Sequence, residues 1–410
     1  MKKFSIFTIG CRTNIAESEK LRAILSEENF QYTENPEEAN YIFINTCTVT
    51  HKADRDSRKI VNRIKKLNKK AKIYIFGCAF YLFKGDERTK ILNYETLLKE
   101  IKKDKIEESV LPPEKSGHSR YFLKIQEGCN YRCTFCIIPF KRGKSRSIPL
   151  ESLIHETKVA LSKGYMEIVL TGTQIGDYGK DIEKDLNLKI LIEKLLDIDS
   201  NFRIRLSSLH PSHFYKIFDL LTEKRIAPHL HIPLQSASEK ILRDMKRPYS
   251  LKFFDETINK ILKINRNFSI GTDLIIGFPT EKDKEFKETV NYLKNSPFSY
   301  IHVFSYSKRE GTPAAELKEI EPHKIKEKME IIKEIDKEKR EKFMKSLLNK
   351  IIKPVYEKKE NGFLKGLSEY GFQVKFKGNK IKKGEITNVF VNKIENKCLI
   401  GFKLDYEIDK

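Results

Sequence analysis

The stretch Glu127-Gly-Cys-Asn-Tyr-Arg-Cys-Thr-Phe-Cys136 places three cysteines, Cys129, Cys133 and Cys136, in a C-x3-C-x2-C spacing directly after the apolar run Tyr121 to Gln126. A [4Fe–4S] cluster usually takes four cysteine ligands, so three closely spaced thiolates leave one iron with an open coordination site. A disulfide cannot use three cysteines evenly, and a zinc site would need a fourth ligand from elsewhere. The spacing therefore predicts a cluster whose open iron binds a small molecule.

The composition of the 410-residue chain indicates the kind of protein, its number of domains and its compartment. With 39% hydrophobic residues, the chain is long enough for packed cores in two or three domains. Seven cysteines without an even pairing pattern indicate a reducing, cytoplasmic location. The apolar stretch Phe4 to Gly10 is short and contains Ser5 and Thr8, which argues against a lipoprotein signal. No segment approaches the roughly 18 apolar residues of a membrane span, so we expect a soluble protein.

The charge balance indicates a polyanionic partner. Lys and Arg total 79 against 57 Asp and Glu, which gives a formal net charge of +22. Basic clusters gain free energy by displacing counterions from phosphates, so RNA or DNA is the simplest partner. The alternative is a lysine-rich chain whose charged faces are merely solvated.

The first hundred residues alternate between apolar runs and charged, helix-periodic segments. The predicted strands are Phe4 to Ile9, Tyr41 to Asn45 and Lys72 to Phe76, and the predicted helices are Glu17 to Asn29 and Asp54 to Asn68. This alternation predicts a parallel sheet in a three-layer α/β domain over residues 1–112. The composition of Pro112 to Gly117 is that of a linker and marks the end of this domain.

Each of these three strands is followed by a cysteine: Cys11, Cys47 and Cys78. Ligands gather outside the carboxyl ends of strands in parallel sheets, so these cysteines could converge without any local motif. Structural cysteines would more often fall inside the strands as small hydrophobic residues. The placement favours a second cluster site.

The central region, residues 113–345, carries six further strand-like runs that alternate with helical segments, a pattern that predicts a full or partial (β/α)6 barrel with its site at the strand carboxyl ends. A charged helix from Pro322 to about Lys350 has an apolar stripe that we expect to pack on the barrel. The six runs are Tyr121 to Gln126, Glu167 to Leu170, Arg203 to Ser207, His229 to Leu234, Ser269 to Ile276 and Tyr300 to Ser305.

The last part of the chain, residues 346–410, changes to short alternating runs separated by glycines. Between Lys350 and Lys410 there are 14 Lys against 8 Asp and Glu. These features predict a small antiparallel β-barrel that binds RNA on a basic face. Cys398 lies inside an apolar run and is expected to be a core residue.

Taken together, the motifs resemble the methylthiotransferases, which are radical S-adenosylmethionine enzymes with a second cluster in the N-terminal domain and a C-terminal RNA-binding TRAM domain. The resemblance rests on the cysteine triplet and on Gly10-Cys-Arg-Thr-Asn14, Glu17-Ser-Glu19, Asn45-Thr-Cys47, Phe76-Gly-Cys78, Thr171 to Gly179, His231 to Ser236, Thr272 to Pro279 and Tyr306 to Thr312. The Gly10 to Asn14 opening is most similar to the branch that acts on N6-threonylcarbamoyladenosine at tRNA position 37.

The resemblance implies two [4Fe–4S] clusters and S-adenosylmethionine as cofactors, with tRNA (anticodon stem-loop, position 37), an electron donor and a sulfur source as partners. One cluster, on Cys129, Cys133 and Cys136, would cleave S-adenosylmethionine, and the other, on Cys11, Cys47 and Cys78, would present sulfur. Candidate cofactor-binding residues near the barrel-strand ends are Gly172, Gln174, Arg205, Ser207, Gln235 and Gly277. Many radical enzymes carry Gly-Gly-Glu where this chain has Thr171 to Gln174, and no catalytic side chain is assigned.

Three other functions stay open on the sequence. Two lie in the same family: methylthiolation of isopentenyladenosine at position 37, and of an aspartate in a ribosomal protein. The third is of another class, an iron–sulfur RNA-binding protein that senses redox state without catalysis. Consumption of S-adenosylmethionine would separate the enzymes from the sensor.

Overall fold

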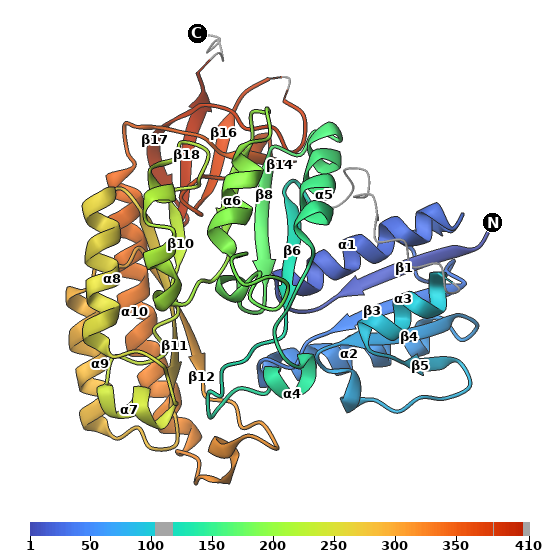
Figure 1. Cartoon of the computed structure of the whole chain (residues 1–410), viewed down its shortest axis with the longest axis horizontal. Helices are drawn as coiled ribbons and strands as arrows, with labels where there is room; N and C mark the ends of the chain where they lie inside the picture. The colour runs from blue at the N-terminus through green and yellow to red at the C-terminus, as the bar shows by residue number, and fades with distance from the viewer. Residues whose placement is uncertain (103–117, 380, 405–410) are drawn as a thin grey trace.

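The computed structural model describes residues 1–102, 118–379 and 381–404, which form three sheet systems in chain order (Figure 1). The boundary that we predict at Pro112 to Gly117 lies outside the described residues. A parallel N-terminal sheet is followed by a curved parallel sheet and then by a mostly antiparallel C-terminal sheet. No helix in the described ranges is both long enough and apolar enough to cross a membrane.

The N-terminal sheet is the middle layer of the predicted three-layer α/β arrangement. Ile42 and Ile44 pack against α2, whereas Phe43 between them packs against α1 and α3, because successive side chains of a strand point to opposite faces. All its pairs are parallel, in the order β2-β1-β3-β4-β5. The elements are β1 (Lys3–Thr8), α1 (Arg12–Glu27), β2 (Gln31–Tyr32), β3 (Tyr41–Thr46), α2 (His51–Leu67), β4 (Lys72–Gly77), β5 (Thr89–Ile91) and α3 (Tyr94–Lys102).

The six predicted barrel strands are all present and neighbour one another in chain order. They are β6 (Tyr121–Glu127), β8 (Glu167–Gly172), β9 (Arg203–Leu206), β10 (His229–His231), β11 (Ser269–Ile276) and β12 (Tyr300–Ser305). A parallel bridge between Ser208 and His231 joins the β7-β6-β8-β9 sheet to the β10-β11-β12 sheet, and a second bridge pairs Ile204 of β9 with Ile226, shortly before β10. β7 (Arg146–Ser147) is an antiparallel edge on β6. Within the described residues nothing pairs β12 with β6 or β7, so the barrel is partial, as predicted.

β10 is shorter than the predicted run, His229 to Leu234, for a local reason. Pro233 has no N–H to donate to a neighbouring strand, and the Leu234 N–H is bound by the Thr272 side-chain oxygen at 3.0 Å. Gln235 then adopts a left-handed backbone with φ of 69°. The chain therefore bulges at Pro233 and Leu234 and then pairs with β11 again, through the Gln235 N–H on the Asp273 carbonyl at 2.8 Å and the Ile275 N–H on the Gln235 carbonyl at 2.9 Å.

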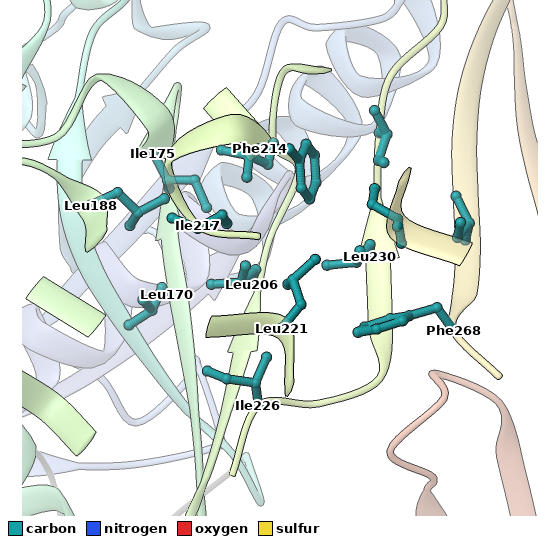
Figure 2. Packing of buried hydrophobic residues seen from close by; sticks show 14 of the residues in the cluster. Leu170, Ile175, Leu188, Leu206, Phe214, Ile217, Leu221, Ile226, Leu230 and Phe268 are labelled. Atoms are coloured by element: carbon teal, nitrogen blue, oxygen red, sulfur yellow. The ribbon is translucent and has the colours of Figure 1, made fainter. Parts of the chain in front are cut away.

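Helices cover the outside of the barrel and close its core. Figure 2 shows part of that core, where Leu170, Leu206 and Leu230 come from three neighbouring strands and pack with Phe214 and Leu221. The helices are α4 (Ile138–Arg142), α5 (Leu150–Ser162), α6 (Leu188–Leu196), α7 (Glu239–Asp244), α8 (Leu251–Ile264), α9 (Asp283–Asn295) and α10 (Pro322–Ser346). Ile332 and Ile335 of α10 are buried in the same core, so the predicted apolar stripe does pack on the barrel.

The C-terminal sheet has six strands in the order β13-β17-β18-β16-β15-β14. Its pairs are antiparallel, as predicted, except that β16 and β18 run parallel. Register shifts at Tyr356/Lys358 and Val391/Lys393 mark bulges that bend the strands. The strands are β13 (Ile351–Ile352), β14 (Val355–Glu360), β15 (Phe363–Leu367), β16 (Gln373–Lys377), β17 (Val389–Glu395) and β18 (Cys398–Lys403).

This sheet covers the amino ends of the barrel strands, at the top of the view in Figure 1, while α4 and the cysteine loop lie at the opposite end. Arg203 at the start of β9 donates to the Lys353 carbonyl at 2.7 Å. The Tyr300 ring at the start of β12 meets Phe372 edge-on at 6.3 Å between centroids. The C-terminal sheet and the cysteine loop therefore lie at opposite ends of the barrel (Figure 1).

Candidate iron–sulfur and cofactor-binding site

The loop that carries Cys129, Cys133 and Cys136 leaves the carboxyl end of β6, as the sequence predicts for a barrel site. The Cys129 N–H is bound by the Gly143 carbonyl at 3.1 Å, and Thr134 is pinned to the end of α7 through the Met245 and Asp244 carbonyls. Burial, together with the neighbouring Cys133 and Cys129, raises the pKa of the Cys136 thiol to about 12. The loop thus gathers one buried cysteine, Cys133, and two half-buried ones, Cys129 and Cys136.

An arginine from a distant part of the chain contacts a cysteine of this loop. Arg247 donates from Nη1 to Cys133 Sγ at 3.1 Å and stacks over Tyr249 with its guanidinium carbon 5.0 Å from the ring centre. A cation beside sulfur suits a thiolate rather than a thiol, and cluster ligands are thiolates. The donor set of three thiols and one guanidinium therefore fits a [4Fe–4S] cluster.

The second triplet lies at the carboxyl ends of three adjacent strands. Cys11, Cys47 and Cys78 follow β1, β3 and β4, which neighbour one another in the N-terminal sheet. Burial, together with the neighbouring Cys47 and Cys11, raises the pKa of the Cys78 thiol to about 12 against the lowering effect of Arg142. Burial likewise raises the pKa of Cys47 to about 11, with Cys11 among the further causes. The structure thus brings the three thiols together, and this donor set also fits an iron–sulfur cluster.

Two glycines before these cysteines are required by close approach. A Cβ on Gly10 would lie 2.7 Å from Cys47 Cβ, and one on Gly77 would lie 2.3 Å from Asn45 Oδ1. Their φ values, 125° and 90°, lie in the region that favours glycine. The Gly-Cys pairs of the sequence are therefore explained by the packing of the second triplet.

A buried network that the sequence did not reveal joins the two triplets. Arg142, at the end of α4, donates from Nε to Cys78 Sγ at 2.9 Å and from Nη1 to Glu17 and Glu127 at 2.6 and 2.7 Å. Lys124 bridges the same two carboxylates at 2.9 and 2.6 Å. Burial alone would raise the pKa of Glu17, but Lys124 and Arg142 hold it at about 2. The only sequence signal was Glu17 within the Glu17-Ser-Glu19 motif.

A cavity of about 200 Å³ opens between the two cysteine sites. Its wall includes Cys136 from one triplet and Val49 and Thr50, which follow Cys47 of the other. The remaining lining is largely apolar, with a few polar side chains: Phe135, Ile137, Ile138, Gln235, Asp273, Ile275, Phe304, Ser305, Tyr306, Ser307 and Arg309. An apolar cavity with a few polar groups is typical of a small-molecule site.

Asp273 and Arg309 are two polar groups of this cavity that the sequence did not single out individually. Asp273 receives a hydrogen bond from His231 Nε2 at 3.0 Å; burial favours its neutral form, but His231 and His302 hold its pKa well below the usual range. Arg309 is only 6% exposed and donates from Nη1 to Asp54 and Thr48 of the N-terminal domain. Its Nε and Nη2 atoms have no partner among the described residues.

Four of the predicted cofactor-binding residues lie at strand carboxyl ends. Gly172 ends β8, and a Cβ there would lie 2.7 Å from the Gln126 carbonyl. The Gln174 N–H is bound by Gln126 Oε1 at 2.8 Å. The Ser207 hydroxyl follows β9 and has no partner among the described residues, and Gln235 lines the cavity.

Two of the predicted residues have other partners. The Arg205 guanidinium is bound by Glu167 at 2.7 Å and by the Ser368 and Glu369 carbonyls at 2.9 and 3.1 Å, under the C-terminal sheet. Its side chain faces the amino ends of the strands, away from the cysteine loop, so we do not retain it as a cofactor ligand. A Cβ on Gly277 would lie 2.7 Å from Ile325 of α10, so that glycine makes room for a helix.

The comparisons with known proteins agree with this geometry. Residues 123–293 match the model of the radical SAM superfamily, and residues 3–96 match that of uncharacterized protein family UPF0004. Among solved structures, the chain resembles the radical S-adenosylmethionine methyltransferase TsrM from Kitasatospora setae, with a TM-score of 0.55 and 15% identity over 77% of each chain. At that identity the likeness concerns the fold alone. The barrel and its matched model define a radical S-adenosylmethionine enzyme, a class that uses S-adenosylmethionine and a [4Fe–4S] cluster.

Curated relatives place the chain more narrowly. It is 38% identical to the threonylcarbamoyladenosine tRNA methylthiotransferase MtaB of Aquifex aeolicus, over 83% of this chain and 89% of the relative. The Bacillus subtilis protein of the same name is 33% identical over 96% and 94%. The tRNA-2-methylthio-N(6)-dimethylallyladenosine synthase of Petrotoga mobilis is 34% identical over 97% and 98%. The chain belongs to the methylthiotransferase family, which confirms the resemblance found in the sequence.

Proposed function

We propose that the protein converts N6-threonylcarbamoyladenosine at position 37 of tRNA to its 2-methylthio derivative. The observation that carries this proposal is the cavity between two cysteine triplets. Two relatives named for this activity, matched over most of the chain, support it. When bound, two clusters and S-adenosylmethionine would supply radical and sulfur chemistry at an unactivated C–H bond that no side-chain base can deprotonate usefully.

Each part of the chain has a role in this proposal. Cys129, Cys133 and Cys136 would hold the cluster that binds S-adenosylmethionine, and Cys11, Cys47 and Cys78 would hold the second. Gly172, Gln174, Ser207 and Gln235 would surround the cofactor. Residues 1–112 would form the second-cluster domain, 113–345 the radical domain and 346–410 the TRAM-like RNA-binding domain. A cytoplasmic location would supply tRNA, an electron donor and a sulfur source.

Arg309 favours the threonylcarbamoyl substrate over the isopentenyl alternative. Its Nε and Nη2 atoms form the side-on edge of the guanidinium, the edge that receives carboxylates in bidentate fashion, and here that edge is buried without a partner. A threonylcarbamoyl group ends in a carboxylate, whereas an isopentenyl group is a hydrocarbon. S-adenosylmethionine also carries a carboxylate, so the test must separate the two.

Arg309→Leu is expected to reduce methylthiolation of threonylcarbamoylated tRNA by about a hundredfold, since a charged hydrogen bond lost from a buried site costs about 2–3 kcal/mol. Cleavage of S-adenosylmethionine without tRNA should continue at the parent rate. The control is Asp54→Asn, which removes the interdomain ion pair but keeps Arg309. Loss of cleavage in Arg309→Leu, with Asp54→Asn active, would assign Arg309 to the methionine carboxylate instead.

Exposed lysines on the strands and turns of the C-terminal domain are proposed to contact tRNA phosphates. Replacing Lys359, Lys377, Lys382 and Lys397 together with Gln should weaken tRNA binding and reduce the slope of log K against log salt by up to about 3, because each phosphate contact contributes about 0.7–0.9. The matched control replaces four exposed lysines of α10, Lys324, Lys326, Lys333 and Lys337. Equal slope changes in the two variants would contradict a dedicated RNA face.

The experiment that tests the proposed function is a reaction with reconstituted protein, S-adenosylmethionine and reductant under oxygen-free conditions. Three substrates are compared: threonylcarbamoylated tRNA, isopentenylated tRNA and a ribosomal-protein peptide. A methylthiolated product on the first substrate alone supports the proposal. Product on either of the others would select that branch, and 5′-deoxyadenosine formed with none of them would reject all three. Absence of any S-adenosylmethionine consumption would leave the redox sensor.

A further inference from the structure

Arg142 is the one described side chain that touches both a cysteine of the second triplet and the strand that leads to the first. It ends α4, six residues after Cys136. Its Nε lies 2.9 Å from Cys78 Sγ, and its Nη1 lies 2.7 Å from Glu127 Oε1. Glu127 ends β6, two residues before Cys129. One guanidinium therefore connects the two cysteine sites.

The surroundings of Arg142 hold it in a fixed orientation. Arg142 is 8% exposed and Glu17 is 1% exposed, so these two side chains are buried, whereas Glu127 and Lys124 are partly exposed. Two cations, Arg142 and Lys124, face two carboxylates, Glu17 and Glu127, at 2.6 to 2.9 Å. The carboxylates accept from Nη1 and, through Glu17 Oε2 at 3.3 Å, from Nη2, and they neutralise the charge of the guanidinium within the network. The Nε–H is left to point at sulfur.

We propose that Arg142 is a positioning residue of the second cluster: it fixes the Cys78 thiolate against β6 and raises the reduction potential of the cluster that Cys78 ligates. The inference rests on the proposed function, in which Cys78 holds a cluster. Hydrogen bonds to ligand sulfur stabilise the reduced, more negative state of an iron–sulfur cluster. Planar geometry matters here, because only arginine reaches the sulfur and two carboxylates from one rigid fork.

The chain offers a matched control at the other cluster. Arg247 donates to Cys133 Sγ at 3.1 Å, and among the described residues it forms no ion pair with Asp or Glu. The two arginines thus make the same kind of contact, each with one triplet. Each should affect the potential of its own cluster only.

The test is a redox titration followed by electron paramagnetic resonance in full-length protein that keeps one triplet. In the Cys129→Ala, Cys133→Ala, Cys136→Ala background, adding Arg142→Gln should shift the midpoint of the remaining cluster to a more negative potential, whereas adding Arg247→Gln should leave it unchanged. In the Cys11→Ala, Cys47→Ala, Cys78→Ala background, Arg247→Gln should shift the midpoint of the remaining cluster to a more negative potential. Arg142→Gln should leave that midpoint unchanged. Arg142→Lys, which keeps the charge in a folded protein, should give a smaller shift in the same direction.

The outcomes separate the inference from the function on which it rests. Four irons in the first background with a midpoint that neither Arg142 variant moves would overturn the role of Arg142 and leave the second cluster in place. No iron in that background would refute the second cluster and the inference together. In the otherwise intact enzyme, Arg142→Lys should lower methylthiolation while cleavage of S-adenosylmethionine continues.

Discussion

Replacing Cys11, Cys47 and Cys78 together with Ala is expected to abolish methylthiolation while cleavage of S-adenosylmethionine continues. The three thiols lie at the ends of adjacent strands in the N-terminal sheet, and the cleavage chemistry is proposed for the other triplet on the barrel loop. Iron content should fall from about eight to about four per chain, since each triplet can hold one cubane. Product analysis, 5′-deoxyadenosine release and iron determination on the same preparation check all three points.

The matched variant replaces Cys129, Cys133 and Cys136 with Ala, which should lose the same amount of iron but both activities. Cys398→Ser is a further control, because Cys398 is a buried residue of β18, well separated in the fold from either triplet. If the first triple variant loses cleavage as completely as the second, the proposed division of labour between the triplets is wrong.

Arg205→Met is expected to destabilise the protein by about 3 kcal/mol, because it leaves the Glu167 carboxylate short of a partner in a buried site. Both side chains are at most 1% exposed, and Arg205 also binds two carbonyls of the C-terminal sheet. The urea midpoint measures the loss. The exposed pair of Lys189 with Asp219 provides the control, and Lys189→Met should leave the midpoint unchanged.

The pH dependence of this loss follows from Glu167. Burial favours its neutral form, but Arg205 and Arg203 hold its pKa well below the ordinary 4.5. A carboxylate whose pKa is lower in the folded state than in the unfolded state stabilises the fold above pH 4.5. That stabilisation is lost as the pH falls through the lowered pKa. The difference in the free energy of unfolding between Arg205→Met and the parent should therefore be largest at neutral pH. It should become smaller below about pH 4, where Glu167 in the variant becomes protonated. A gap that widens on acidification would contradict this ion-pair role.

The architecture could be predicted because it depends on local patterns. Apolar runs such as Tyr41 to Asn45 and Ser269 to Ile276 became strands nearly residue for residue, since alternation with helices leaves a parallel sheet as the simplest arrangement. The positions of the cysteines at strand ends followed from the same topology. Those placements required no knowledge of contacts between distant residues.

The partners of individual side chains could not be predicted, because they depend on contacts between residues far apart in the sequence. Arg142 meets a cysteine 64 positions away, and Arg205 meets carbonyls 163 and 164 positions away. Nothing local distinguishes an arginine that binds a cofactor from one that holds a domain in place, and Arg205 was assigned to the wrong partner on strand position alone. The neighbour of Gly277 was equally hidden, because Ile325, the helix residue that a Cβ there would meet, lies 48 positions further along the chain.

The most direct test of the central claim is mass spectrometry of nucleosides from digested tRNA of cells that lack the gene. The proposed function predicts that 2-methylthio-N6-threonylcarbamoyladenosine disappears and that its unmethylthiolated precursor accumulates, with both restored by the parent gene and not by the Cys11, Cys47 and Cys78 triple variant. An unchanged level of that nucleoside, or loss of the 2-methylthio derivative of isopentenyladenosine in its place, would contradict it.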